Sequence, residues 1–188
     1  MSRWEPDAMG RLVKAAMALF AEQGYEDTTV AQIAARAGLT KRTFFRYFSD
    51  KREVLFGGSQ ELQRIWLDAA AAAPPDATPL AVATAGFGPV ADLFAERHQF
   101  AGVRAAIIEA NPELRERELI KLQNLAGSLE GALVDRGVSV DAAVLAAQAA
   151  VTVFHVAFAR WVQQDDPAAF RRLMDQSLQD LRAVTAAP

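Results

Sequence analysis

A tight turn between two short helical patterns constrains the fold of this chain more than any other feature of its sequence. The two patterns lie within residues 28–51 and meet at Ala37-Gly38-Leu39. Gly38 can take the positive φ that a close interhelical turn needs, and Thr40 can cap the second helix by accepting a backbone N–H. The pattern therefore predicts a helix-turn-helix.

The second of these helices is basic in a chain that is acidic overall. Six cations and one carboxylate lie between residues 36 and 52, a local balance of +5, whereas the whole chain has a formal net charge of −3. A basic island of this kind indicates an anionic partner for that region alone. On a helix, Phe44 and Phe48 share one face, whereas Arg42 and Phe45 point elsewhere. One face is expected to pack and the other to enter a DNA groove; a basic face that only contacts solvent is the alternative.

Many positions between residues 11 and 56 agree, in register and without a gap, with the pattern of one known family. They are Ala15-Ala16, Leu19-Phe20, Gly24-Tyr25, Thr28-Thr29-Val30, Ile33-Ala34, Ala37-Gly38-Leu39, Thr43-Phe44-Phe45, Tyr47-Phe48 and Lys51. On these residues the chain closely resembles the N-terminal domain of TetR-type transcriptional regulators. The downstream segment Asn111-Pro112-Glu113-Leu114 looks like the C-terminal domain of the branch named after the mycofactocin regulator.

The recognition helix supplies most of the expected DNA contacts. Arg42 is a candidate for guanine because its paired donors match the two acceptors of that base. Tyr47 and Lys51 are expected to hold phosphates, as the resemblance implies, and Thr29 to do the same with its hydroxyl and nearby amides. The complete predicted set is Thr29, Thr40, Lys41, Arg42, Thr43, Phe45, Arg46, Tyr47 and Lys51.

Composition limits the chemistry that the chain can perform. With 188 residues, of which 52% are hydrophobic, the chain can bury a normal core in at most about two modest domains. It has no cysteine, which excludes disulfides, thiolate metal sites and thiol redox sensing. Its two histidines, His98 and His155, are far apart in sequence and lack carboxylates at metal-ligand spacing. We therefore expect no metal, no cofactor and no catalytic residue.

Neither an export signal nor a membrane span is expected. Residues 1–7 lack the apolar core and the cleavage site of a signal peptide. Residues 142–159 are mostly apolar, but they are rich in alanine and are interrupted by Gln148, Thr152 and His155. A helix buried on two sides is favoured over one that crosses a membrane. A cytoplasmic setting fits both observations.

Helical periodicity and its breaks predict an all-α chain of about nine helices. Prolines in residues 74–79 mark the clearest loop, and Gly86, Gly88 and Pro89 should interrupt the helix that follows it. Residues 1–52 are expected to form a three-helix DNA-binding domain, and residues 53–188 a larger helical domain for effector binding and dimerisation. The predicted helices are residues 8–23, the two short helices of the turn motif, 50–72 with Asp50 as cap, 80–96, 98–110, 112–136, 139–164 and 167–184.

The last two helices, at about 139–164 and 167–184, carry wide apolar faces. Such faces could form a four-helix bundle with a second chain, which is how TetR-like proteins dimerise. Two-fold symmetry would then place two DNA-binding domains about 34 Å apart on a pseudo-palindromic operator. A monomer that buries these faces internally is the alternative. The faces comprise Val144, Leu145, Ala149, Val153, Val156 and Ala157, and Phe170, Leu173, Met174, Leu178 and Leu181.

By resemblance, helices of the C-terminal domain surround an effector cavity. Its apolar character favours a hydrophobic or amphipathic effector, and the branch resemblance would allow an acyl thioester or another lipid-like compound. Each apolar residue in the set could equally be plain core, and His155 a hydrogen-bonded core histidine. The predicted effector-binding residues are Trp66, Phe94, Phe100, Arg104, Ile107, Leu122, Phe154, His155 and Phe158.

Together these features predict a homodimeric, ligand-responsive DNA-binding regulator. A repressor is favoured over an activator because occluding a promoter needs no contact with polymerase. A helical small-molecule carrier or enzyme with a vestigial helix-turn-helix is one alternative, and it predicts no specific duplex binding. An architectural DNA-binding protein is another, and it predicts similar affinity for every duplex.

Overall fold

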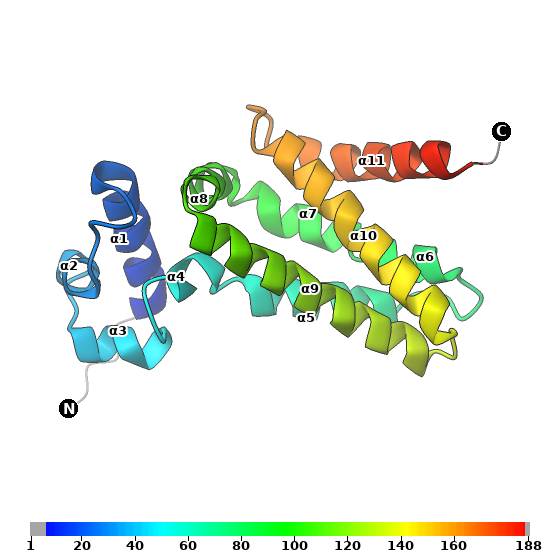
Figure 1. The fold of residues 1–188 in the computed structure, drawn as a ribbon, viewed down its shortest axis with the longest axis horizontal. Helices are drawn as coiled ribbons and strands as arrows, with labels where there is room; N and C mark the ends of the chain where they lie inside the picture. The colour runs from blue at the N-terminus through cyan, green and yellow to red at the C-terminus, as the bar shows by residue number, and fades with distance from the viewer. Residues whose placement is uncertain (1–6, 187–188) are drawn as a thin grey trace. The chain divides into compact units, whose positions relative to one another are not determined.

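The computed structural model of the protein describes residues 7–186. Residues 1–6, on which most of the expectation about an export signal rests, and residues 187–188 lie outside the described part. Every regular element among the described residues is a helix, as predicted (Figure 1). Eleven helical segments are labelled within residues 7–186. Two residues separate α4 from α5, and two residues separate α6 from α7; if each of these pairs is counted as one interrupted helix, the total in this described part is the predicted nine.

The chain divides into two compact units. The first contains residues 1–58 and 103–118, and the second contains residues 59–102 and 119–188. The first unit holds α1 (Ala8–Gln23), α2 (Val30–Arg36), α3 (Lys41–Tyr47) and α4 (Glu53–Phe56), with the end of α8 (His98–Ala110) and the start of α9 (Pro112–Asp135).

Local signals begin and end the helices of the first unit, with Thr40 and Gly38 in the roles that the sequence predicted. The Asp7 side chain accepts the Gly10 amide at 3.0 Å at the start of α1, and Gly24 ends that helix with φ 89°. Thr40 Oγ1 accepts the Thr43 amide at 3.1 Å and so caps α3. Gly38 lies in the α2–α3 turn with φ 68°, a conformation that few other residues adopt without strain. The predicted helix-turn-helix is therefore present.

One helix differs from its prediction. The single helix expected over residues 50–72 is wrong, because Gly57 and Gly58 separate α4 from α5 (Ser59–Ala71). A Cβ at Gly57 would lie 3.2 Å from Met9 Cε and 3.3 Å from Phe48 Cε1, so these side chains pack closely against the glycine. Asp50 still caps the start, because its Oδ1 accepts the amides of Arg52 at 2.8 Å and Glu53 at 3.2 Å.

The second unit is built around α10 (Val140–Trp161), which packs against α11 (Ala169–Thr185) and α6 (Pro79–Thr84). Its remaining elements are α5, α7 (Phe87–Ala95), the start of α8 and most of α9. By length and composition α10 could cross a membrane, but half of its apolar stretch is buried inside the protein. The core helix of a protein can have the same length and apolar composition. The sequence predicted such a buried helix for residues 142–159.

The interruption between α6 and α7 falls where glycine was expected to cause it. A Cβ at Gly86 would overlap the Trp66 ring, so only a glycine lets that ring approach. Trp66 Nε1 donates to the Ala83 carbonyl at 2.7 Å, next to the break. A buried indole thus fills the gap in the helix and satisfies a carbonyl beside it.

The apolar faces predicted for dimerisation need correction. Leu145 and Val156 are 72% and 47% exposed on α10, whereas Val153 and Ala157 are buried. The prediction that the apolar face of α11 contacts a second chain is wrong, because this face packs into the core of its own unit. The buried residues there are Phe170, Leu173 and Met174, with Leu178 and Leu181 packed partly against the same core.

Candidate nucleic-acid interface

Helix α3 has one buried side and one exposed side, as its pattern predicted. Phe44 is fully buried and its ring lies 5.5 Å from that of Phe48, which is 4% exposed. Phe45 is 55% exposed, and Lys41 and Arg42 are exposed beside it. The buried rings hold the helix against its own unit, and this leaves a basic surface with one aromatic ring facing outwards.

This exposed side of α3 is hollowed. Arg42, Thr43, Phe45 and Arg46 line a hollow of about 550 Å³. Guanidinium and hydroxyl groups are the donors that base edges accept in a major groove, and an apolar ring can contact a thymine methyl group. The Thr43 hydroxyl also lies 3.1 Å from that of Thr40, which ties it to the cap of the helix.

Arg46 and Tyr47 form a pair at the end of α3. Arg46 Nη2 donates to Tyr47 Oη at 3.1 Å, and the guanidinium carbon lies 4.9 Å from the ring centroid. Arg46 therefore lies along α3, and its other N–H groups can still donate. The pair offers a guanidinium and a phenol together to a phosphate.

Lys51 has a structural role that the sequence did not indicate. Its Nζ donates to the carbonyls of Tyr25 at 2.8 Å and Glu26 at 3.1 Å, and it lies 4.2 Å from the Tyr25 ring centroid. An ammonium has three donors, so one remains for the predicted phosphate. Lys51 thereby fastens the loop that leads into α2.

The side chain of Thr29 also has hydrogen-bond partners within the protein, at the start of α2. Its hydroxyl accepts the Gln32 amide at 3.3 Å and donates to Gln32 Oε1 at 2.8 Å, while that oxygen accepts the Thr29 amide at 2.8 Å. This reciprocal arrangement is a capping box. The hydroxyl predicted to contact phosphate is thus already hydrogen-bonded at the start of α2.

Two of the cations between residues 36 and 52 are held in ion pairs away from the exposed side of α3. Arg36 forms an ion pair with Glu22 at 2.6 Å, and Arg52 forms one with Asp50 at 2.8 Å. Among the residues that the structure describes, no carboxylate lies within ion-pair distance of the three cations on the exposed side of α3. These are Lys41, Arg42 and Arg46.

Two acidic groups behind this surface have shifted pKa values. Partial burial alone would raise the pKa of Asp50, but hydrogen bonds from the Arg52 side chain and from the amides of Glu53 and Arg52 lower it below its usual value. Burial raises the pKa of the Tyr25 phenol, and the neighbouring Glu113 carboxylate raises it further. Glu113 belongs to the 103–118 segment, so this segment influences the loop that Lys51 holds.

The nine residues predicted to bind an effector are divided between the two compact units. Four of them share an aromatic cluster in the second unit, and Phe100 and Leu122 are half-buried in the same unit. Arg104 and Ile107 belong to the first unit instead. His155 is exposed on α10, so the alternative that it is a core histidine is wrong. The four clustered residues are Trp66, Phe94, Phe154 and Phe158.

Aromatic rings from five helices fill the centre of the second unit. The Phe94 centroid lies 5.6 Å from those of Phe158 and Phe170, and Trp161 stacks on Phe170 at 4.7 Å. The cluster also contains His98, whose ring centroid is 4.6 Å from that of Trp161. The sequence did not indicate His98, because its partner lies 63 residues further along the chain.

Comparison with known proteins identifies the family. Residues 12–56, which contain α2, α3, α4 and most of α1, match the family described as bacterial regulatory proteins, tetR family. The chain belongs to the TetR family. It is 31% identical over 139 residues to the HTH-type transcriptional regulator TcmR of Streptomyces glaucescens, an alignment that covers 70% of this chain and 61% of TcmR. The chain thus matches about three fifths of the length of that relative.

Solved structures of other proteins share the fold of this chain. One is FadR of Thermus thermophilus in complex with lauroyl-CoA, with a TM-score of 0.58, 21% identity and 96% of each chain covered. Another is SmeT, the repressor of the Stenotrophomonas maltophilia multidrug efflux pump SmeDEF. It has a TM-score of 0.61 and 17% identity, with 94% of this chain and 89% of SmeT covered. At these identities the likeness establishes the fold alone.

Proposed function

We propose that this chain is a DNA-binding transcriptional regulator that acts as a homodimer in the cytoplasm and catalyses no reaction. The observation that carries the proposal is the exposed side of α3, where Arg42, Phe45 and Arg46 line one hollow while Phe44 and Phe48 are buried on the opposite side. Acting as a repressor needs only that the bound protein block a promoter.

Base reading and phosphate binding are assigned to different residues. Arg42, with Lys41, Thr43 and Phe45, is placed to read base edges, because these residues project from the first turns of α3. Arg46 and Tyr47 are placed to hold phosphates. The remaining predicted contacts are Thr40, at the cap of α3, Thr29, whose hydroxyl already serves α2, and Lys51, which has one donor to spare.

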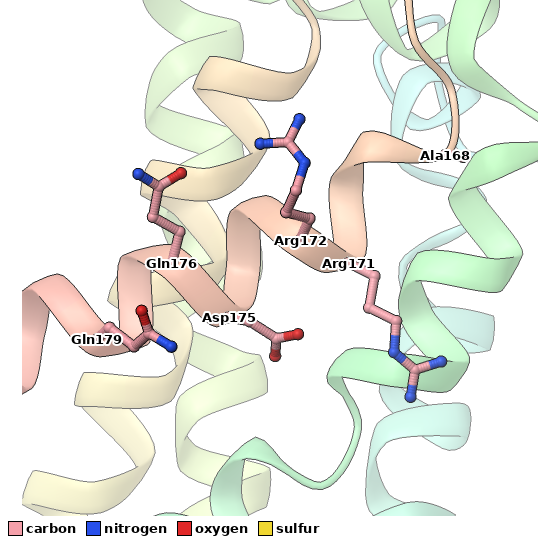
Figure 2. Close-up of a pocket in the computed structure, with 6 residues that line it drawn as sticks. All are labelled: Ala168, Arg171, Arg172, Asp175, Gln176 and Gln179. Atoms are coloured by element: carbon pink, nitrogen blue, oxygen red, sulfur yellow. The ribbon is translucent and has the colours of Figure 1, made fainter.

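Dimerisation is assigned to α10 and α11. The exposed stripe of α10 includes Leu145 and Val156, and Arg160 on the same helix bonds Gln176 of α11 at 3.3 Å. Figure 2 shows Arg172 and Gln176 projecting from one side of α11, away from Arg171 and Asp175 on the other. A second copy would therefore meet an apolar stripe on α10 and polar side chains on α11. Two-fold symmetry pairs identical stripes, as homodimers require.

A hydrophobic or amphipathic small molecule is the proposed effector. FadR of Thermus thermophilus, which shares this fold, was solved with lauroyl-CoA. In this chain the aromatic cluster of the second unit is the proposed site, because Phe94 and Phe158 are only partly buried there. The effector releases DNA only if it binds the DNA-free conformation better, and a coupling of about 1 to 3 kcal/mol would weaken DNA binding roughly 5- to 150-fold.

Selection of duplexes from a random pool by the purified full-length chain tests the proposal. We expect enrichment of one pseudo-palindromic site, and a steep fall in affinity for that site as salt rises. Equal affinity for all duplexes would indicate an architectural protein instead. No duplex binding at all would favour a carrier or enzyme with a vestigial helix-turn-helix.

A further inference from the structure

Residues 103–118 belong to the same compact unit as the recognition helix, although they lie within the sequence assigned to the C-terminal domain. They comprise the end of α8 and the first turns of α9. Two arginines of this segment, Arg104 and Arg117, contact α4. Their contacts explain why the segment belongs to the first unit.

Arg104 makes three contacts at the end of α4. Its Nε donates to the Leu55 carbonyl at 2.6 Å, and its two terminal nitrogens donate to Glu118 Oε1 at 3.1 Å and Oε2 at 2.6 Å. The guanidinium carbon lies 5.1 Å from the Phe56 ring centroid. The Arg104 and Glu118 side chains are 17% and 25% exposed, so water screens this ion pair little.

The Leu55 carbonyl matters because α4 stops one residue later. In an uninterrupted helix this carbonyl would accept the amide four residues further on. Gly57 and Gly58 interrupt the helix before that point, and Arg104 supplies a donor. A charged donor from another segment thus stabilises the interrupted end.

Arg117 holds the other end of α4. Its Nε and Nη2 donate to Glu53 Oε1 at 2.9 and 2.6 Å, and Glu53 is the first residue of the helix. A helix of four residues has no stability of its own in water. Helix α4 therefore depends on its buried side chains and on these two arginines.

Helix α4 is linked to α3 through the core of the first unit. Val54, Leu55 and Phe56 are at most 3% exposed, and α4 packs against α1, which contacts α2 and through it α3. Gly57 at its end packs closely against Phe48, the C-cap residue of α3. A displaced α4 would leave the buried side of α3 without this support.

We infer that Arg104 and Arg117 are positioning residues for DNA reading, which they support through α4 without touching DNA. The inference rests on the proposed function. It assigns to residues 103–118 a part in the DNA-binding unit, so that a change in these residues alters DNA affinity directly.

The test compares the full-length Arg104→Ala protein with wild type on the selected duplex. Losing a charged hydrogen bond and an ion pair should weaken specific binding about 10- to 100-fold. The slope of log affinity against log salt should stay unchanged, because no phosphate contact is lost. Amide hydrogen exchange should accelerate in α4 and α3 but not in α10. Arg97→Ala is the matched control, since Arg97 forms an exposed ion pair with Glu61 in the second unit, and it should change none of these.

Unchanged DNA affinity together with unchanged amide hydrogen exchange in α4 would overturn the inference. A shallower slope of log affinity against log salt would also overturn it, because Arg104 would then contact DNA itself. If Arg104→Ala fails to fold, Arg104→Lys and Glu118→Gln are judged by the same criteria. Absence of specific binding by the wild-type protein would refute the proposed function alone. Hydrogen exchange in α4 and α3 would then decide the positioning role.

Discussion

The six cations between residues 36 and 52 divide into two groups according to what they contact. Arg36 and Arg52 are held by carboxylates, and Lys51 is held by two backbone carbonyls. The other three cations lie on the exposed side of α3. Within this second group Arg46 donates to Tyr47, whereas the described residues show no hydrogen bond or ion pair of the Lys41 and Arg42 side chains. Single-residue changes at Lys41 or Arg42 should therefore act on binding and spare the fold.

Arg42→Ala should weaken binding to the preferred site by about 1 to 3 kcal/mol and relax the choice of base at one position. The reason is that a guanidinium that bonds a base edge discriminates between bases, whereas a phosphate contact does not. Fluorescence anisotropy on the selected duplex and on its single-base variants measures both effects. Arg64→Ala, an exposed arginine of the second unit, is the control. Equal losses on all duplexes would count against base reading by Arg42.

Lys51→Ala should weaken binding to all duplexes alike and reduce the salt slope by about 1. It should also destabilise the protein by about 1 to 3 kcal/mol, because the carbonyls of Tyr25 and Glu26 lose their donor. Urea unfolding measures the second effect separately from the first. A change in sequence preference with no loss of stability would show that both roles assigned to Lys51 are wrong.

At the scale of elements, local signals in the sequence were sufficient to place most helix ends. Asp7, Thr29 and Thr40 cap the helices that follow them, Gly24 ends α1, and Gly38 adopts the positive φ expected of it. The break in the fourth helix was missed although Gly57-Gly58 is a local signal for it. The contacts around the break are non-local, since Met9 and Phe48 approach Gly57 and Arg104 lies 49 residues from Leu55.

The cap at the start of α4 gives a prediction about pH. The pKa of Asp50 is lowered in the folded protein, so its carboxylate stabilises the fold above its unfolded pKa of about 3.9, and this contribution is lost as pH falls further. Asp50→Asn can still accept both amide hydrogen bonds but carries no charge. The free energy of unfolding of wild type should therefore exceed that of the variant above about pH 5, and the difference should shrink towards pH 3. Urea titrations across this range would contradict the account if the difference stayed constant.

At the scale of the whole molecule, patterns of apolar residues predicted which side of a helix is buried but not what covers it. The stripe on α11 was expected to meet a second chain, yet Phe170, Leu173 and Met174 are buried in the core of their own unit. The predicted effector residues had the same ambiguity, since an aromatic residue on a core face fits a cavity or plain packing equally well. The boundary after residue 52 remains a prediction about function, and the compact units divide the chain elsewhere.

Leu145→Glu tests the proposed dimer. A carboxylate in the middle of a self-complementary apolar stripe would face its own copy, so dissociation into monomers and loss of most operator affinity are expected. Leu119→Glu is the matched control, because Leu119 is also an exposed leucine, 61% accessible, but lies on α9 outside the proposed contact. Sedimentation analysis would refute the proposed face if Leu145→Glu remained dimeric, or if both variants dissociated equally.

The central claim is that α3 of each protomer enters a major groove and that two such helices read one site. Hydroxyl-radical footprinting of the full-length protein on its selected duplex tests this most directly. We predict two protected patches on one face of the duplex, with their centres about one helical turn apart, roughly 34 Å. At one fixed, sub-saturating protein concentration, both patches should be protected less when Arg42 is replaced by alanine. Uniform protection along the duplex, or a footprint that Arg42→Ala leaves intact, would contradict the claim.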